Sequence, residues 1–151
     1  MTIVACSKKE RKMIADTLLA DGDCRVRSGY TDKIFRCSDG SLVGAAGDSD
    51  ACWAFIKWAQ AGRTDEYPTE ALKESDKFEA VILTPAREIL VYNSSKYPDP
   101  MIGDTFCIGA GSQFAMGALY AGASLEEAVK AAVALSTLCG GKLTTLILDK
   151  R

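Results

Sequence analysis

The sequence has 151 residues, of which 48% are hydrophobic and 25% are charged, and its 18 basic and 20 acidic residues give a formal charge of −2. This length and composition fit one ordinary domain, residues 1–151, that is stable without metal ions or disulfides. The sequence contains no histidine. Ser-His-Asp and Cys-His mechanisms and every histidine metal site are therefore excluded, so another group must supply the base for acid–base chemistry near neutral pH.

Several other classes of function receive no support. Basic residues are interspersed with acidic ones, so no basic patch indicates nucleic-acid binding. The first residues lack the pattern of a signal peptide, and no apolar stretch approaches the ~20 residues that span a membrane. The six cysteines form no CxxC pair and are expected to be reduced. We therefore expect a cytoplasmic protein without a cofactor or a metal ion.

The first half of the chain is predicted to contain strand hairpins and one helix. Short apolar and β-branched runs alternate with polar turns, and Asp39-Gly40 is a strong hairpin signal. Trp53 and Trp58 lie five residues apart on the predicted helix and cannot share one apolar stripe, so at least one should contact something beyond the local core. We expect strands at 2–6, 12–16, 33–37 and 41–46, and a helix over 48–61 that Gly62 ends.

The second half is predicted to contain a further hairpin, a strand, two helices and a final strand. The sequence Ser124-Leu125-Glu126-Glu127 is a capping box that begins the last helix, and Gly140-Gly141 is expected to end it. Because strands occur in hairpins and helices lie apart from them, the order indicates antiparallel sheets with helices outside, an α+β layered domain. We expect a helical turn near 69–74, strands at 78–83, 88–92, 105–108 and 143–148, a loop at 93–100 and a helix over 112–120.

Thr2 is the best candidate for chemistry that does not need histidine. A residue as small as threonine at this position normally permits removal of Met1, which would give Thr2 a free amine. An α-amino group has a pKa of about 8, so it can serve as the base for the hydroxyl of the same residue. The alternative interpretation is that Thr2 is only the first residue of an edge strand. The mechanism depends entirely on the loss of Met1.

Three further residues fit such a site. Asp16 ends the predicted partner strand of the first hairpin, and Lys33 begins the next one. An ammonium beside Thr2 would favour the developing alkoxide, and a carboxylate would hold that ammonium in place, although an exposed ion pair has the same pattern. Gly47 lies where a strand leads into the first long helix. It either presents its amide to an oxyanion or only permits a tight turn.

Six strings in this order resemble the proteasome β-subunit family, including the bacterial HslV-type peptidases. They are MTIVA, MIAD, KIFR, VGAAGD, IGAGSQFAMG and CGG, and they span nearly the whole chain. The resemblance implies the N-terminal-nucleophile fold, a four-layer αββα sandwich with two antiparallel sheets between helical layers, in subunits that form stacked rings around a chamber. It also implies that Thr2 is both nucleophile and base, that Lys33 tunes it, that Asp16 orients Lys33, and that Gly47 donates to the oxyanion.

Three positions depart from the pattern of that family. The turn after the late strand usually reads Gly-Ser-Gly, whereas this chain has Ala110 there and Ser112 two residues later. The aspartate and serine that precede the double glycine in the family fall on Ser136 and Cys139. Without a histidine to activate it, Cys139 fits a buried thiol better than a nucleophile. The groups that hold and protonate the terminal amine are therefore depleted.

The leading hypothesis is a threonine peptidase of the proteasome β/HslV type, a homo-oligomer that hydrolyses peptides or unfolded protein. By analogy, an ATP-dependent unfoldase would feed its chamber. The alternative is a ring-forming scaffold or binding protein with the same fold and no activity, which Ala110, Ser136 and Cys139 favour. A small-molecule amidase with an open, monomeric active site is a third reading.

Overall fold

The computed structural model describes residues 2–21, 24–73, 75 and 77–150. The helices in these residues are α1 (Ser49–Gln60), α2 (Thr69–Lys73), α3 (Ser112–Tyr120) and α4 (Leu125–Leu135). The strands are β1 (Val4–Ser7), β2 (Lys12–Ala15), β3 (Leu18–Asp21), β4 (Cys24–Tyr30), β5 (Ile34–Arg36), β6 (Leu42–Ala46), β7 (Glu79–Leu83), β8 (Ile89–Tyr92), β9 (Asp99–Met101), β10 (Thr105–Ile108) and β11 (Thr144–Ile147).

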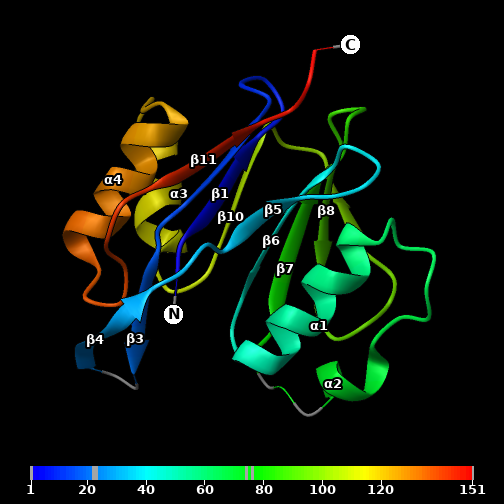
Figure 1. The fold of residues 1–151 in the computed structure, drawn as a ribbon. Coiled ribbons are helices and arrows are strands. Elements are labelled where there is room, and N and C mark those ends of the chain that lie inside the picture. The colour runs from blue at the N-terminus through cyan, green and yellow to red at the C-terminus, as the bar shows by residue number, and fades with distance from the viewer. Residues whose placement is uncertain (1, 22–23, 74, 76, 151) are drawn as a thin grey trace.

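Two antiparallel sheets lie between two helical layers. The first sheet has the strand order β10-β1-β2-β11, and the second has the order β5-β6-β7-β8-β9. Helices α3 and α4 cover the first sheet, and α1 and α2 cover the second, as Figure 1 shows. A separate antiparallel pair, β3-β4, extends from the first sheet toward the viewer's lower left. The predicted αββα sandwich is confirmed.

Both faces of β1 and β2 are buried, which explains why they appear in the sequence as nearly continuous apolar runs. Val4 and Met13 point into the core between the two sheets. Ala5 and Ile14, one residue further along each strand, point into the core beneath α3 and α4. A third core lies between the second sheet and α1, and Phe55 is buried at its centre.

Most predicted elements are confirmed within a residue or two, and their local signals act as expected. Asp39 accepts a hydrogen bond from the Ser41 N–H, and Gly40 takes a φ of 86° in the β5-β6 turn. The Ser124 hydroxyl accepts from the Glu127 N–H while the Glu127 carboxylate accepts from the Ser124 N–H, which completes the capping box of α4.

Three predictions about the elements are wrong. Helix α4 ends at Leu135 rather than at Gly140-Gly141, because the backbone of Ser136 is extended and its hydroxyl accepts a hydrogen bond from the Leu138 N–H. The strand β9 lies within and beyond the predicted loop; its proline is tolerated on an edge strand. The β3-β4 pair was not expected, although the sequence has a turn signal, Asp21-Gly22, between its two strands.

Candidate active site

The first hairpin and the start of β5 bring Thr2, Asp16 and Lys33 together. In the β1-β2 pairing Val4 lies opposite Ala15, so the register carries Ile3 opposite Asp16, and the Asp16 N–H donates to the Ile3 carbonyl at 3.2 Å. Lys33 immediately precedes β5 in the second sheet. The site therefore lies where the two sheets meet, at the end of the first hairpin away from its turn.

Asp16 is the centre of this cluster. Its Oδ1 accepts hydrogen bonds from the Thr2 hydroxyl at 2.7 Å, the Lys33 ammonium at 2.8 Å and the Ile3 N–H at 3.1 Å. Its Oδ2 accepts from the Gly140 N–H at 3.0 Å. Asp16 is fully buried, and a buried carboxylate is tolerated only when such donors replace the lost water.

Lys33 is fixed by two acceptors rather than by one. Its Nζ donates to Asp16 Oδ1 and also to the Leu18 carbonyl, each at 2.8 Å. The side chains of Lys33 and Asp16 are 9% and 0% exposed, so the pair is not the exposed ion pair that the sequence also allowed. Removal from water strengthens the attraction between the ammonium and the carboxylate and holds the cation beside Thr2.

The backbone of Thr2 is held by the turn that follows β10. The Gly111 N–H donates to the Thr2 carbonyl at 3.1 Å. Gly109 has a φ of 94°, and a Cβ on it would overlap the Thr2 carbonyl oxygen. The close approach of this turn therefore requires glycine at 109, and it fixes Thr2 from the side opposite Asp16.

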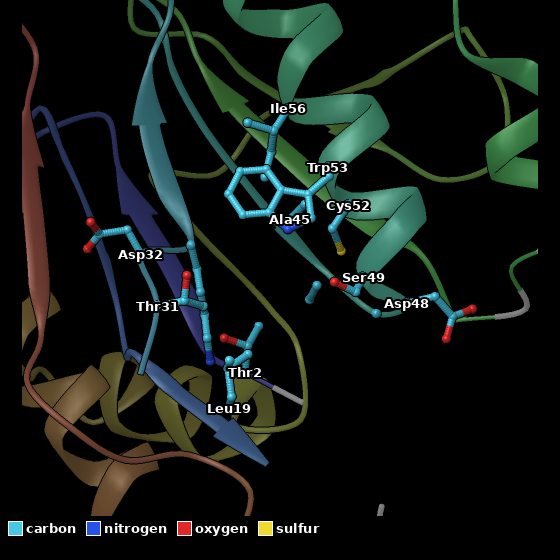
Figure 2. Close-up of a pocket in the computed structure, with 13 residues that line it drawn as sticks. Thr2, Leu19, Thr31, Asp32, Ala45, Asp48, Ser49, Cys52, Trp53 and Ile56 are labelled. Atoms are coloured by element: carbon cyan, nitrogen blue, oxygen red, sulfur yellow. The ribbon is translucent and has the colours of Figure 1, made fainter. Parts of the chain in front are cut away.

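A cavity of about 360 Å³ opens beside Thr2. Figure 2 shows Thr2 and Leu19 on one side of it and Trp53 and Cys52, both from α1, on the other. Trp53 is 42% exposed at the rim and lies 5.5 Å from the ring of Phe35, measured between ring centroids. The other lining residues are Thr31, Asp32, Lys33, Ala45, Ala46, Gly47, Asp48, Ser49 and Ile56.

The lining of the cavity is mixed: α1 and the end of β6 contribute apolar side chains, whereas Thr2, Thr31, Lys33, Ser49 and two aspartates are polar. The carboxylates of Asp32 and Asp48 point away from the cavity in Figure 2. Asp32 Oδ1 accepts from the Thr144 hydroxyl at 3.0 Å, and Asp48 Oδ2 accepts from the Ser75 hydroxyl at 2.6 Å. These bonds hold both carboxylates away from the cavity, so on its α1 side a bound group would meet the apolar side chains of Trp53 and Ile56.

The two tryptophans of α1 have different surroundings, as their spacing predicted. Trp58 packs edge-on against Tyr67, with ring centroids 4.9 Å apart, in the aromatic cluster around Phe55. Trp53 leaves this cluster and forms part of the cavity wall. Trp53 is therefore the tryptophan that is placed to contact a group beyond the local core.

Gly47 lies in the turn between β6 and α1 and lines the Thr2 cavity. Its φ is 119°, and a Cβ there would overlap the Lys77 carbonyl oxygen. The same residue also lines a second cavity of about 410 Å³, which is bounded by Glu79 and Gly109. The tight turn is thus a structural fact, whereas the role of the Gly47 amide in holding an oxyanion stays a prediction.

The sequence also offers Ser112, Ser136 and Cys139 as possible accessory groups near the terminal amine, and they occupy different places. Ser112 is half-buried at the start of α3, and its N–H donates to the Gly109 carbonyl. Ser136 is buried beside Cys139 at the end of α4. Burial raises the pKa of the Cys139 thiol, and the Asp16 carboxylate raises it further, against a lowering by Ser136 and Lys33. Cys139 therefore stays a neutral thiol near neutral pH, and this opposes a nucleophilic role.

Sequence reasoning missed the groups that act through the backbone or through packing. The Gly140 amide and the Leu18 carbonyl complete the hydrogen bonds of Asp16 and Lys33. The CGG string in the sequence contains Gly140, but nothing in that string indicated which group the Gly140 amide would bind. In the part of the chain that the structure describes, no group of three cysteine, aspartate or glutamate side chains is arranged to hold a metal ion. None of the described helices has both the length and the hydropathy needed to cross a bilayer.

The two antiparallel sheets between two helical layers define a fold of the N-terminal-nucleophile-hydrolase type. No protein-family model matches the sequence. No curated protein matches it either. Solved structures do match over almost the whole chain, and they show an HslV-like proteasome β-type fold.

Three of these structures illustrate the likeness. Thiobacillus denitrificans BPH is 22% identical with a TM-score of 0.71, and the match covers 98% of each chain. The same protein in complex with Epoxomicin is 21% identical with a TM-score of 0.69, over 99% of this chain and 100% of that one. Eukaryotic HslV from Trypanosoma brucei is 18% identical with a TM-score of 0.74, also over 99% of this chain and 100% of that one. At these identities the likeness establishes the fold and leaves the activity to be argued from the site.

Proposed function

We propose that this chain is a threonine peptidase in which Thr2 is the nucleophile once Met1 has been removed. The observation that carries the proposal is the buried network joining the Thr2 hydroxyl, the Asp16 carboxylate and the Lys33 ammonium at the edge of the cavity. Met1 itself lies outside the described residues. An α-amine on Thr2 would supply the base that the absence of histidine leaves vacant.

The proposed reaction begins when the Thr2 Oγ1 attacks a peptide carbonyl and its proton passes to the α-amine. The hydroxyl must turn for this, because in the structure it donates to Asp16. The carbonyl oxygen becomes an oxyanion held by the Gly47 amide, and the nearby Lys33 ammonium favours the developing negative charge. The C–N bond then breaks, the protonated amine gives its proton to the leaving nitrogen, and water hydrolyses the remaining ester to free Thr2.

The cavity supports a substrate with an apolar side chain next to the bond that is cleaved. Leu19 and Trp53 are exposed at its mouth, and Ala45 and Ile56 belong to its lining. Burying an apolar side chain there would remove the surfaces of that side chain and of the lining residues from water. The gain in binding free energy would be about 25 cal/mol per Å² of apolar area buried. Peptides and unfolded proteins present such side chains.

Exposed apolar residues on the outer helical layer support assembly with further copies of the chain. Helix α3 contains no charged residue, and Phe114, Met116 and Tyr120 are exposed on it, with Tyr120 at 96%. Leu135, at the end of α4, is 64% exposed. Apolar surface of this kind is stabilised by burial in an interface. We propose stacked rings with the Thr2 sites facing an enclosed chamber, to which an ATP-dependent unfoldase would deliver unfolded protein.

The test combines intact mass with a covalent probe. We expect purified protein to have lost the mass of Met1 and to gain one molecule of epoxomicin, an epoxyketone that reacts with both the hydroxyl and the amine of a terminal threonine. Thr2→Ala should lose the adduct, whereas Thr2→Ser, which keeps a hydroxyl and an amine, should retain it. Active protein that keeps Met1, or cleavage that survives in Thr2→Ala, would refute the proposal.

An inactive scaffold with the same fold is the second candidate. It is favoured by Ala110, Ser136 and Cys139, which replace the polar groups expected around the terminal amine. Fully processed protein that forms rings but gives no adduct with epoxomicin would support the scaffold. Sedimentation tests the third hypothesis, a monomeric small-molecule amidase. A monomer at working concentration would contradict both ring-forming candidates.

A further inference from the structure

The loop after α4, residues 139–142, is linked to the segment that carries Asp16 at several points. The Gly140 N–H donates to Asp16 Oδ2 at 3.0 Å. The Gly140 carbonyl accepts from the Thr17 N–H at 3.2 Å and from the Leu18 N–H at 3.1 Å. The proposed reaction uses no residue of this loop. The loop nevertheless supplies the Gly140 N–H, which donates to the second oxygen of the Asp16 carboxylate.

The side chain of Thr17 closes this arrangement. Its hydroxyl donates to the Lys142 carbonyl at 2.7 Å, and the residue is 8% exposed. Gly141 packs directly against it: a Cβ on Gly141, which has a φ of 78°, would lie 2.6 Å from Thr17 Oγ1. One hydroxyl therefore ties the far end of the loop to the residue next to Asp16 in the chain.

The bond from Gly140 determines how the Asp16 carboxylate is turned. Three donors meet Oδ1, where the Thr2 hydroxyl and the Lys33 ammonium share one oxygen. The Gly140 amide is the donor on Oδ2, and it fixes the plane of the carboxylate about its last rotatable bond. If the loop moves, the carboxylate can rotate, and both Thr2 and Lys33 lose their common reference point.

We propose that Thr17 is a positioning residue: its hydroxyl holds the 139–142 loop so that the Gly140 amide orients Asp16, and through Asp16 the Thr2 and Lys33 side chains. The catalytic consequence rests on the proposed peptidase function. Thr17 touches no reacting atom in this scheme, so its loss should lower kcat and leave KM nearly unchanged.

The experiment compares two pairs of proteins that differ at the hydroxyl: the wild type with Thr17→Val, and Thr17→Ser with Thr17→Ala. Thr17→Val keeps the shape of threonine without the donor, and Thr17→Ser and Thr17→Ala form a second pair without the methyl group. Thr84→Val is the matched control, because Thr84 is similarly buried and its hydroxyl accepts a hydrogen bond from the Glu88 N–H at 3.1 Å. Thr84 lies just after the last residue of β7. Glu79, at the other end of β7, is the residue that approaches Gly109, so the control is at the end of the strand away from that turn.

Three quantities are measured on the assembled, processed protein: kcat and KM across pH for a peptide substrate, hydrogen exchange of the segment 139–142 by mass spectrometry, and thermal unfolding. We expect kcat to fall about 10- to 100-fold in Thr17→Val and Thr17→Ala, with a changed pH profile and faster exchange in the loop. Thr17→Ser and Thr84→Val should keep the kcat and the pH profile of the wild type.

Two results would overturn the proposal while the wild type remains active. One is a Thr17→Val protein with unchanged kcat and unchanged loop exchange. The other is an equal loss in Thr17→Ser and Thr17→Ala, which would assign the effect to the methyl group. If Thr17→Val does not fold, the serine and alanine pair decides alone. A wild type that never reacts with epoxomicin refutes the peptidase function instead, and exchange then decides whether Thr17 holds the loop.

Discussion

The two sides of the Thr2 cavity are built in opposite ways. On one side, Thr2 and Asp16 are buried, the Lys33 side chain is only 9% exposed, and the three are joined by hydrogen bonds of 2.7 to 2.8 Å. On the other side, α1 presents Trp53 and Cys52 as an apolar wall that is partly open to solvent. A polar network that is removed from water keeps one geometry, whereas an apolar wall can accept different groups of similar size. The first side should therefore govern rate and the second should govern which substrate is accepted.

The strongest test of this comparison is Lys33→Met, which removes the ammonium but keeps an unbranched side chain. Asp16 would then be a buried carboxylate without its cation, so we expect the free energy of unfolding to fall by about 3–5 kcal/mol. Cleavage should fall by about 10³-fold in kcat, because the charge that favours the alkoxide is lost. Urea unfolding and steady-state kinetics measure the two effects.

Lys12→Met is the control for that prediction. Lys12 Nζ lies 3.2 Å from Glu10 in a pair of which the side chains are 28% and 30% exposed. An ion pair of this kind contributes at most about 1 kcal/mol, so stability and kcat should stay close to those of the wild type. If stability and kcat fall equally in Lys33→Met and Lys12→Met, the buried ion pair of Asp16 contributes no more than the exposed pair of Lys12.

Gly47→Ala tests the boundary between the two sides. The new Cβ would overlap the Lys77 carbonyl at a backbone conformation that suits glycine, so the turn must shift. If the Gly47 amide holds the oxyanion, kcat should fall by about 10²-fold while KM changes little. Gly40→Ala is the matched control, because Gly40 also has a positive φ, but its Cβ would meet only Pro85 Cγ, at 3.5 Å. Comparable kcat values in the two variants would argue against an oxyanion role.

Trp53→Ala tests the apolar wall. Trp53 is 42% exposed, so its removal should lower the free energy of unfolding by less than about 1.5 kcal/mol. We expect kcat/KM for peptides with a large apolar side chain to fall by about 10-fold, and for peptides with a small one to change little. Trp58→Ala should do the reverse: it should cost about 3 kcal/mol of stability, because Trp58 packs in the aromatic cluster around Phe55. If kcat/KM falls equally for both classes of peptide in Trp53→Ala, the apolar wall does not determine substrate specificity.

The two sides also differ in how far the sequence could predict them. The chemistry of Thr2, Asp16 and Lys33 depends on side chains, so their residue types and their positions at strand ends were informative. The Gly140 amide that completes the bonds of Asp16 lies 124 residues away in the chain. Every residue except proline has such an amide, so composition carries no signal for this contact. Only the fold shows which amide meets the carboxylate.

Packing accounts for the rest of what the sequence did not predict. The apolar stripe that continues to Leu138 predicted a longer α4, but the backbone leaves the helix at Ser136 and turns toward Asp16. The cavity likewise depends on the angle between α1 and the first hairpin, which no local pattern contains. Periodicity does indicate that Trp53 and Trp58 diverge, but not that one of them faces Thr2.

The smallest expected effect concerns Cys52, the thiol in the apolar wall. Burial raises its pKa to about 11, so only a small fraction is thiolate at neutral pH. Because a raised thiol pKa disfavours the reactive thiolate below that value, alkylation by iodoacetamide should be slow at pH 7 and should accelerate about tenfold per pH unit up to pH 9. Peptide mapping by mass spectrometry gives the rate at this one cysteine, and Cys139, which is fully buried, should remain unmodified.

Alkylated Cys52 would project into the cavity and compete with the substrate side chain, while the buried network would stay intact. We expect KM to rise and kcat/KM to fall by no more than about 10-fold, with kcat nearly unchanged. Cys52→Ser, treated in the same way, should lose this effect, and prior reaction of Thr2 with epoxomicin should slow the labelling. A fall in kcat as large as that of Lys33→Met would show that the wall and the network are coupled, and it would end the division between rate and selection on which these predictions rest.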